Sequence, residues 1–175
     1  MSYDLLVFAP DIAPKEREAF LAWWDKTGEW SEDHDYDDPK VCTPQLRAWF
    51  MEMIESYPAM NGPFSMEEPS EDESTVTDYS VGKEAIYAAF AWSKAEAAYE
   101  QVFSLAAKHQ LGFFDASSET SAVWLPDGKG GLRLAHQGEP AEGEESDASY
   151  LPEASSMTGK NAGVDQAGRD DTGDA

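Results

Sequence analysis

The sequence predicts an α+β domain with a mainly antiparallel sheet. Three observations support this class: two short, almost continuous apolar runs at residues 3–9 and 85–92, stretches of helical spacing between and after them, and two further short apolar runs after residue 110. Twenty aromatic residues, including all six Trp, precede Pro126 and supply enough apolar surface for a core. We therefore expect one folded domain over residues 1–126.

The first half of this domain is predicted to contain one strand and two helices. Residues 3–9 are typical of a strand that is buried on both faces. Residues 15–24 form a helix with its large aromatic residues on one side. Thr43 and Pro44 are a good N-cap and first residue for a second helix, whose apolar residues recur at helical spacing until Pro58.

The second half is predicted to contain four strands and one helix. Residues 76–81 alternate between apolar and polar side chains, as a half-buried strand does, and residues 85–92 are again almost continuously apolar. Ser93 and Glu96 have the spacing of a capping box, which predicts that the third helix begins there. The last two strands are predicted at residues 111–115 and 121–125.

The predicted order of elements indicates a topology. Without one of the first two helices and the last strand, the order is βαββαβ, which is the ferredoxin-like arrangement. That arrangement places the first and third strands in the middle of the sheet, and these are the two runs that are almost continuously apolar. We expect a ferredoxin-like core with an extra helix and a C-terminal strand, and with the helices on one face of the sheet.

Residues 127–175 differ in composition from the rest of the chain. Tyr150 is their only aromatic residue, and Gly, Ala, Ser, Asp and Glu dominate. Such a segment buries too little apolar surface to offset the entropy that ordering it would cost. We expect a disordered acidic tail.

The charge restricts the class of partner. The chain has 35 acidic and 12 basic side chains, a formal charge of −23, and residues 1–126 alone carry 24 and 8, a charge of −16. This sign repels nucleic acid and anionic membranes, and it attracts basic proteins. With no secretory signal, no membrane-spanning run and one cysteine, Cys42, we expect a cytoplasmic protein.

The sequence contains no recognisable motif for catalysis, cofactor binding or metal binding. Asp33, Asp35 and Asp37 have the opening spacing of a calcium loop, but the glycine and the final glutamate of an EF-hand are missing. His34, Cys42 and His109 are too scattered for a zinc site. We predict no catalytic residue, no cofactor and no metal ligand.

Acidic residues mixed with aromatic ones are the remaining candidates for a site. Trp30 and Tyr36 lie within the acidic stretch 29–38, and Met60, Phe64 and Met66 precede the acidic run 67–73. Exposed aromatic side chains among carboxylates suit a protein interface; the alternative is that Trp30 and Tyr36 fold back onto the core. The predicted partner-binding residues are Glu29, Trp30, Glu32, Asp33, Asp35, Tyr36, Asp37, Asp38, Glu67, Glu68 and Asp72.

Four segments of residues 1–126 carry a resemblance to a known family, and they concern core strands and helix starts. They are Tyr3-Asp4-Leu5, Pro44 to Arg47-Ala48-Trp49 and on to Tyr57-Pro58, Ile86-Tyr87 to Ala91-Trp92-Ser93-Lys94-Ala95, and His109 with Gly112-Phe113-Phe114-Asp115. These segments resemble a family of small acidic bacterial proteins, largely uncharacterised, some of which are similar to immunity proteins of polymorphic toxin and interbacterial-competition systems.

The resemblance and the charge together favour one function. The resemblance implies a non-enzymatic immunity protein that binds and neutralises a cognate toxin. The charge agrees with this role, because an acidic surface complements the basic cleft of a toxin that acts on nucleic acid. A small enzyme that uses acidic loop residues, and an acidic regulatory or scaffold protein, are the alternatives.

Overall fold

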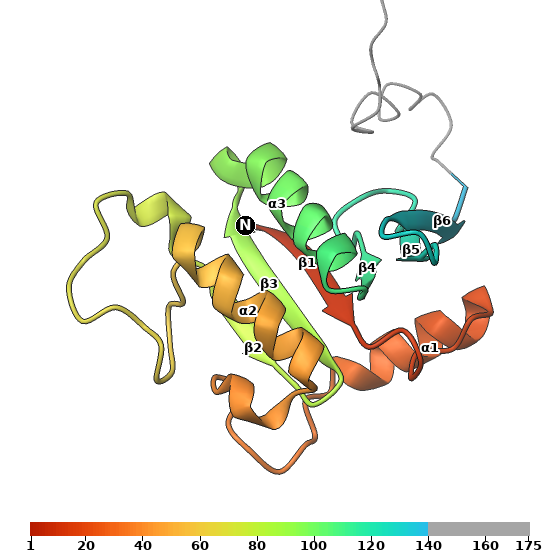
Figure 1. The fold of residues 1–175 in the computed structure, drawn as a ribbon, viewed down its shortest axis with the longest axis horizontal. Helices are drawn as coiled ribbons and strands as arrows, with labels where there is room; N and C mark the ends of the chain where they lie inside the picture. Colours follow the sequence, from red (N-terminus) through yellow and green to blue (C-terminus); the bar gives the residue numbers. More distant parts are fainter. Residues whose placement is uncertain (140–175) are drawn as a thin grey trace, which may run out of the picture. The chain divides into compact units, whose positions relative to one another are not determined.

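The computed structural model describes residues 1–139, in which a six-stranded antiparallel sheet is combined with three α-helices (Figure 1). The order of strands across the sheet is β2-β3-β1-β4-β5-β6. The strands are β1 (Ser2–Phe8), β2 (Asp78–Val81), β3 (Ala85–Ala91), β4 (Gly112–Phe114), β5 (Val123–Pro126) and β6 (Leu132–His136). The helices are α1 (Arg17–Thr27), α2 (Pro44–Ser56) and α3 (Ala95–Lys108), with short 3-10 turns η1 (Pro39–Val41), η2 (Glu73–Thr75) and η3 (Trp92–Lys94).

The interior pair of strands is the one that the sequence predicts. β1 and β3 pair antiparallel over their whole length, from Ser2 opposite Ala91 to Phe8 opposite Ala85. Leu5 and Leu6 are both fully buried although they point to opposite faces of the sheet. Leu5 to Phe8 are all fully buried. A stretch of strand that is covered on both faces needs apolar side chains at successive positions, and this explains the apolar run.

Helices cover both faces of the sheet, so the expectation of helices on one face is wrong. α2 and α3 pack side by side on the face that carries Leu5 and Val7 (Figure 1). On the other face, Phe20 of α1 packs against Leu6 and Phe8. The second face of β1 is as apolar as the first, and α1 supplies the aromatic layer that removes it from water.

The sheet also extends beyond the predicted boundary at residue 126. β6 pairs with β5, with Pro126 opposite Leu132 and Trp124 opposite Leu134. In the turn between them, the Asp127 carboxylate accepts hydrogen bonds from the backbone N–H groups of Lys129 and Gly131. The Gly- and Asp-rich composition that predicts a tail from residue 127 belongs here to a hairpin turn. Residues 140–175 of the predicted tail lie outside the described residues.

These additions change the overall topology. β5 and β6 lengthen the sheet past β4, and α1 lies on the second face, so the strand order is not that of a simple ferredoxin-like domain. What holds is the coarser class, an α+β domain with an antiparallel sheet. Within residues 1–139, no helix is both long enough and apolar enough to cross a membrane.

Candidate functional site

The predicted partner-binding residues lie on two loops. The first acidic loop, residues 29–38, joins α1 to η1, and the second acidic loop, residues 58–72, joins α2 to η2. The loops touch where Gly62 meets Asp37: a Cβ atom on Gly62 would lie 2.3 Å from the Asp37 carbonyl oxygen. Gly62 also has a φ of +91°, a conformation that favours glycine. The structure therefore brings the two acidic loops together at a contact that only glycine fits.

The aromatic residues of the first acidic loop fold back onto the protein. The ring of Trp30 lies 5.1 Å from that of Tyr36 and 6.1 Å from that of Tyr87 on β3. Tyr87 in turn stacks on Trp24 of α1. Trp30 and Tyr36 are half-buried, so they extend the aromatic layer between α1 and the sheet. This is the alternative placement that the sequence left open.

Polar contacts fix the same loop to the turn between β2 and β3. The Glu32 carboxylate accepts a hydrogen bond from the backbone N–H of Lys83, at 3.0 Å, and contacts the His34 ring. The carbonyl of Tyr36 accepts a bond from the N–H of Val81, at 2.8 Å. The carbonyl of Asp35 and the Glu32 carboxylate raise the pKa of His34 above 6.5. Glu32 is therefore occupied with the protein's own groups.

The remaining acids of the first acidic loop have diverse surroundings. Asp38 caps η1 by accepting a bond from the N–H of Lys40, and Glu29 lies 3.8 Å from the Lys26 amine. Asp33 and Asp35 are exposed. Across residues 1–139, no three His, Cys, Asp or Glu side chains are grouped so that they could hold a metal ion. The spacing of a calcium loop is thus present in the sequence but is not assembled into a cluster of ligands.

The second acidic loop is held at its ends. Near its start, the N–H of Met60 donates to the carbonyl of Thr77, and the N–H of Thr77 donates to the carbonyl of Pro58, both at 2.8 Å. At its end, Asp72 accepts bonds from Ser74 and lies 2.9 Å from the Lys94 amine. The bond from the Ser74 hydroxyl, followed by that from Lys94, lowers the pKa of Asp72 to about 2. The loop is therefore anchored beside β2 and the start of α3.

Between these anchors the loop exposes large apolar side chains. Met60 is 52% exposed, Met66 51% and Phe64 41%. The rings of Phe64 and of Phe50 on α2 pack edge to face, with 6.1 Å between their centroids. Among residues 1–139, three of the eight exposed large apolar side chains fall within the seven residues 60–66, and grouped exposed apolar side chains mark interaction sites. This feature distinguishes the second acidic loop from the first.

A hollow of about 230 Å³ is lined by residues of this loop together with Glu73 and Val76, and we call it the methionine groove. Met60 and Met66 belong to its apolar wall, and three glutamates belong to its lining, whereas its lining contains no Lys, Arg or His. The lining residues are Pro58, Ala59, Met60, Met66, Glu67, Glu68, Pro69, Ser70, Glu73 and Val76. Two of the predicted partner-binding residues, Glu67 and Glu68, are therefore placed on a groove.

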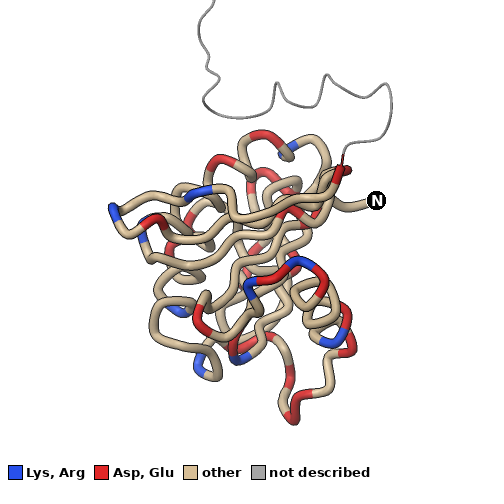
Figure 2. The backbone as a smooth tube through the Cα atoms, turned by 90° about the vertical axis from the view of Figure 1, so that its right-hand side faces the viewer, with Lys and Arg blue, Asp and Glu red and all other residues tan. Residues whose placement is uncertain are grey.

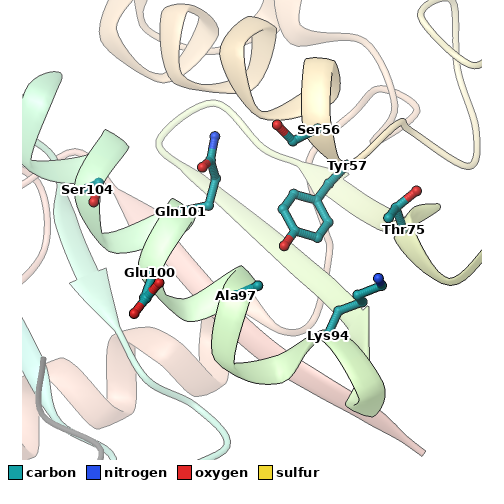
Figure 3. Close-up of a pocket in the computed structure, with 8 residues that line it drawn as sticks. All are labelled: Ser56, Tyr57, Thr75, Lys94, Ala97, Glu100, Gln101 and Ser104. Atoms are coloured by element: carbon teal, nitrogen blue, oxygen red, sulfur yellow. The ribbon is translucent and has the colours of Figure 1, made fainter. Parts of the chain in front are cut away.

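A second hollow, of about 460 Å³, lies between the end of α2 and α3 (Figure 3). The Tyr57 ring stands in its centre, with Gln101 on one side and Lys94 on the other. The Tyr57 hydroxyl is protonated at neutral pH and can donate a hydrogen bond, and burial raises its pKa further. The Lys94 amine already lies against Asp72. This hollow offers hydrogen-bonding groups next to the methionine groove, because Tyr57 and Pro58 are neighbours in the chain.

The described part of the chain is predominantly negative. Residues 1–139 carry 26 acidic and 10 basic side chains. Figure 2 shows acidic positions recurring along the loops and helices, with basic positions scattered between them.

The sequence did not predict a role in a site for Gly62, Tyr57 or Lys94. Only Gly62 leaves a signal, because the Asn-Gly-Pro sequence at residues 61–63 is typical of a turn.

Comparison with the models of known protein families, with curated proteins and with solved structures finds no match. The resemblance to immunity proteins therefore stays a prediction.

Proposed function

We propose that this chain is a non-enzymatic binding protein that captures a basic protein partner through its second acidic loop. The partner class is that of a bacterial toxin, which the chain neutralises as an immunity protein. The single observation that carries the proposal is the exposure of Met60, Phe64 and Met66 beside Glu67 and Glu68. Met and aromatic residues are enriched at the centre of protein interfaces, and methionine adapts its shape to the surface that it meets.

The acidic charge suits the same role. Carboxylates around an interface accelerate the encounter with a basic partner and orient it, whereas the apolar side chains hold the complex once it has formed. The first acidic loop adds Asp33 and Asp35 to this field, and it touches the second at Asp37 and Gly62. We therefore propose that both acidic loops attract the partner and that the second acidic loop holds it in the complex. A surface of this sign disfavours nucleic acid as a direct ligand.

Two further parts of the proposal concern fold and location. The adjacent strands β2, β3, β1 and β4 are antiparallel and pack against α2 and α3; their order supports a ferredoxin-like core to which α1, β5 and β6 have been added. The cysteine Cys42 is buried and free, which agrees with a cytoplasmic protein.

A capture experiment with matched variants tests this function. The full chain is immobilised as bait for an extract of the native host, beside a Met60→Gln, Met66→Gln double variant and a Met51→Gln control. Met51 is an exposed methionine on α2, outside the groove. We expect a basic protein that the wild type and the control retain and the double variant loses. Equal retention by all three baits would contradict the proposal.

A further inference from the structure

The size and chemistry of the methionine groove indicate what enters it. At about 230 Å³ the hollow is smaller than the roughly 300–1,000 Å³ of pockets that bind drug-sized ligands. It is large enough for one long side chain. The groove therefore suits a projecting residue of a partner better than a free metabolite.

The lining selects the kind of side chain. Methionines form part of one wall, and the three carboxylates are those of Glu67, Glu68 and Glu73. Among residues 1–139, none of these three glutamates makes an ion pair, in contrast to Asp72 and Glu52. A side chain that fits must combine an apolar stem with a positive head. Only lysine and arginine have that combination.

Between these two, the groove favours arginine. A guanidinium is flat and more weakly hydrated than an ammonium, so that it loses less hydration when it enters a groove with apolar walls. It can also bind a carboxylate with two parallel hydrogen bonds. We propose that the methionine groove receives one arginine side chain of the partner, with its stem against Met60 and Met66 and its guanidinium at the glutamates. This inference rests on the proposed function and names the anchor residue of its partner.

Methyl NMR of the full chain tests the proposal without the partner. The methionine methyl groups are labelled with ¹³C, and the peptide acetyl-Gly-Arg-Gly-amide is titrated at low salt beside its citrulline and lysine counterparts. Citrulline keeps the shape of arginine and removes its charge. We expect the signals of Met60 and Met66 to shift in a saturable manner with the arginine peptide, while those of Met51 and of the buried Met53 stay in place.

Comparing the affinities of the peptides for the wild type and for two variants tests whether charge and the groove glutamates cause the binding. The citrulline peptide should bind at least about fivefold more weakly than the arginine peptide, and so should the arginine peptide to a Glu67→Gln, Glu68→Gln variant. Glu71→Gln is the matched control, because Glu71 belongs to the same acidic run but not to the lining. Equal binding of the citrulline or lysine peptide, equal loss in the control, or shifts spread over all methionines would overturn the proposal.

The two proposals fail separately. If the arginine peptide leaves Met60 and Met66 unmoved while the double methionine variant still loses its captured protein, the arginine anchor is wrong and the binding function stands. If the peptide binds in the groove while capture is indifferent to both methionines, the second acidic loop is not the site of capture and the proposed function is wrong.

Discussion

The two acidic loops both combine carboxylates with large apolar side chains, but their surroundings are opposite. In the first, Trp30 and Tyr36 turn inward to Tyr87, and Glu32 is bound to the backbone at Lys83. In the second, the ends are anchored, but Met60 and Met66 remain about half exposed along the methionine groove. The first loop passes a sheet face that still needs covering, whereas α2 already covers the sheet face nearest the second. A loop's role thus depends on whether the core beside it has space for its apolar side chains.

The contact between the loops gives the largest expected effect. Gly62→Ala places a Cβ atom against the Asp37 carbonyl oxygen and forces alanine into a left-handed conformation. We expect a loss of about 2–4 kcal/mol in the free energy of unfolding, from the backbone conformation and the overpacking together. Urea unfolding measures it, and Gly128→Ala is the control, because that glycine has a positive φ but open space around it. Equal losses in the two variants would show that the loops do not press on each other.

The second prediction compares the aromatic residues of the two loops. Trp30→Ala removes a half-buried ring that contacts Tyr36 and Tyr87, so we expect a loss of about 2 kcal/mol. Phe64→Ala removes a more exposed ring that packs against the ring of Phe50, so we expect the free energy of unfolding to fall by less than about 1 kcal/mol. Thermal unfolding of both variants checks the order. A larger loss for Phe64→Ala would reverse the roles assigned to the loops.

The third prediction concerns pH and has the smallest effect. The pKa of His34 is raised above 6.5 in the folded protein, mainly by the Asp35 carbonyl and then by Glu32. A raised pKa means that protonation stabilises the fold: the contribution is complete below about pH 6.5 and disappears as the pH rises through the raised value. We expect wild type to be more stable than His34→Gln at pH 5.5, by less than about 1 kcal/mol, and the difference to vanish by pH 9. A difference that grows with pH would contradict the assigned contacts.

Part of the fold follows directly from the sequence. The runs at residues 3–9 and 85–92 are apolar at every position except Asp4, and such nearly continuous runs are typical of interior strands. The Thr43 hydroxyl caps α2 by accepting a hydrogen bond from the N–H of Leu46, and Pro44 is the first residue of the helix. These two residue types suit those positions whatever the tertiary structure. Local chemistry determines these features, and the sequence therefore predicts them.

Features that depend on distant contacts could not be predicted in this way. Ser93 and Glu96 have capping-box spacing, yet η3 continues from β3 and α3 begins at Ala95 without a side-chain cap. The placement of α1 on the second face follows from packing against Leu6 and Phe8, which helical spacing does not reveal. β6 is missed because its turn has the composition of a tail.

The same limit applies to the candidate site. Trp30 and Tyr87 are far apart in the sequence and meet only through the fold, so the sequence could not decide whether Trp30 is buried or exposed. The exposure of Met60 and Met66 likewise depends on how α2 covers the sheet. What the sequence does predict is the acidic character of both loops, because charged side chains remain at the surface wherever the loop runs.

Hydrogen–deuterium exchange on the full chain, with and without the captured partner, tests the central claim most directly. Met60→Gln, Met66→Gln, which should not bind, serves as the control for non-specific protection. We predict that the partner slows exchange in residues 58–72 and leaves residues 29–38 nearly unchanged, since the first acidic loop contributes charge and no anchor. Protection confined to residues 29–38 would contradict the assignment of retention to the second acidic loop.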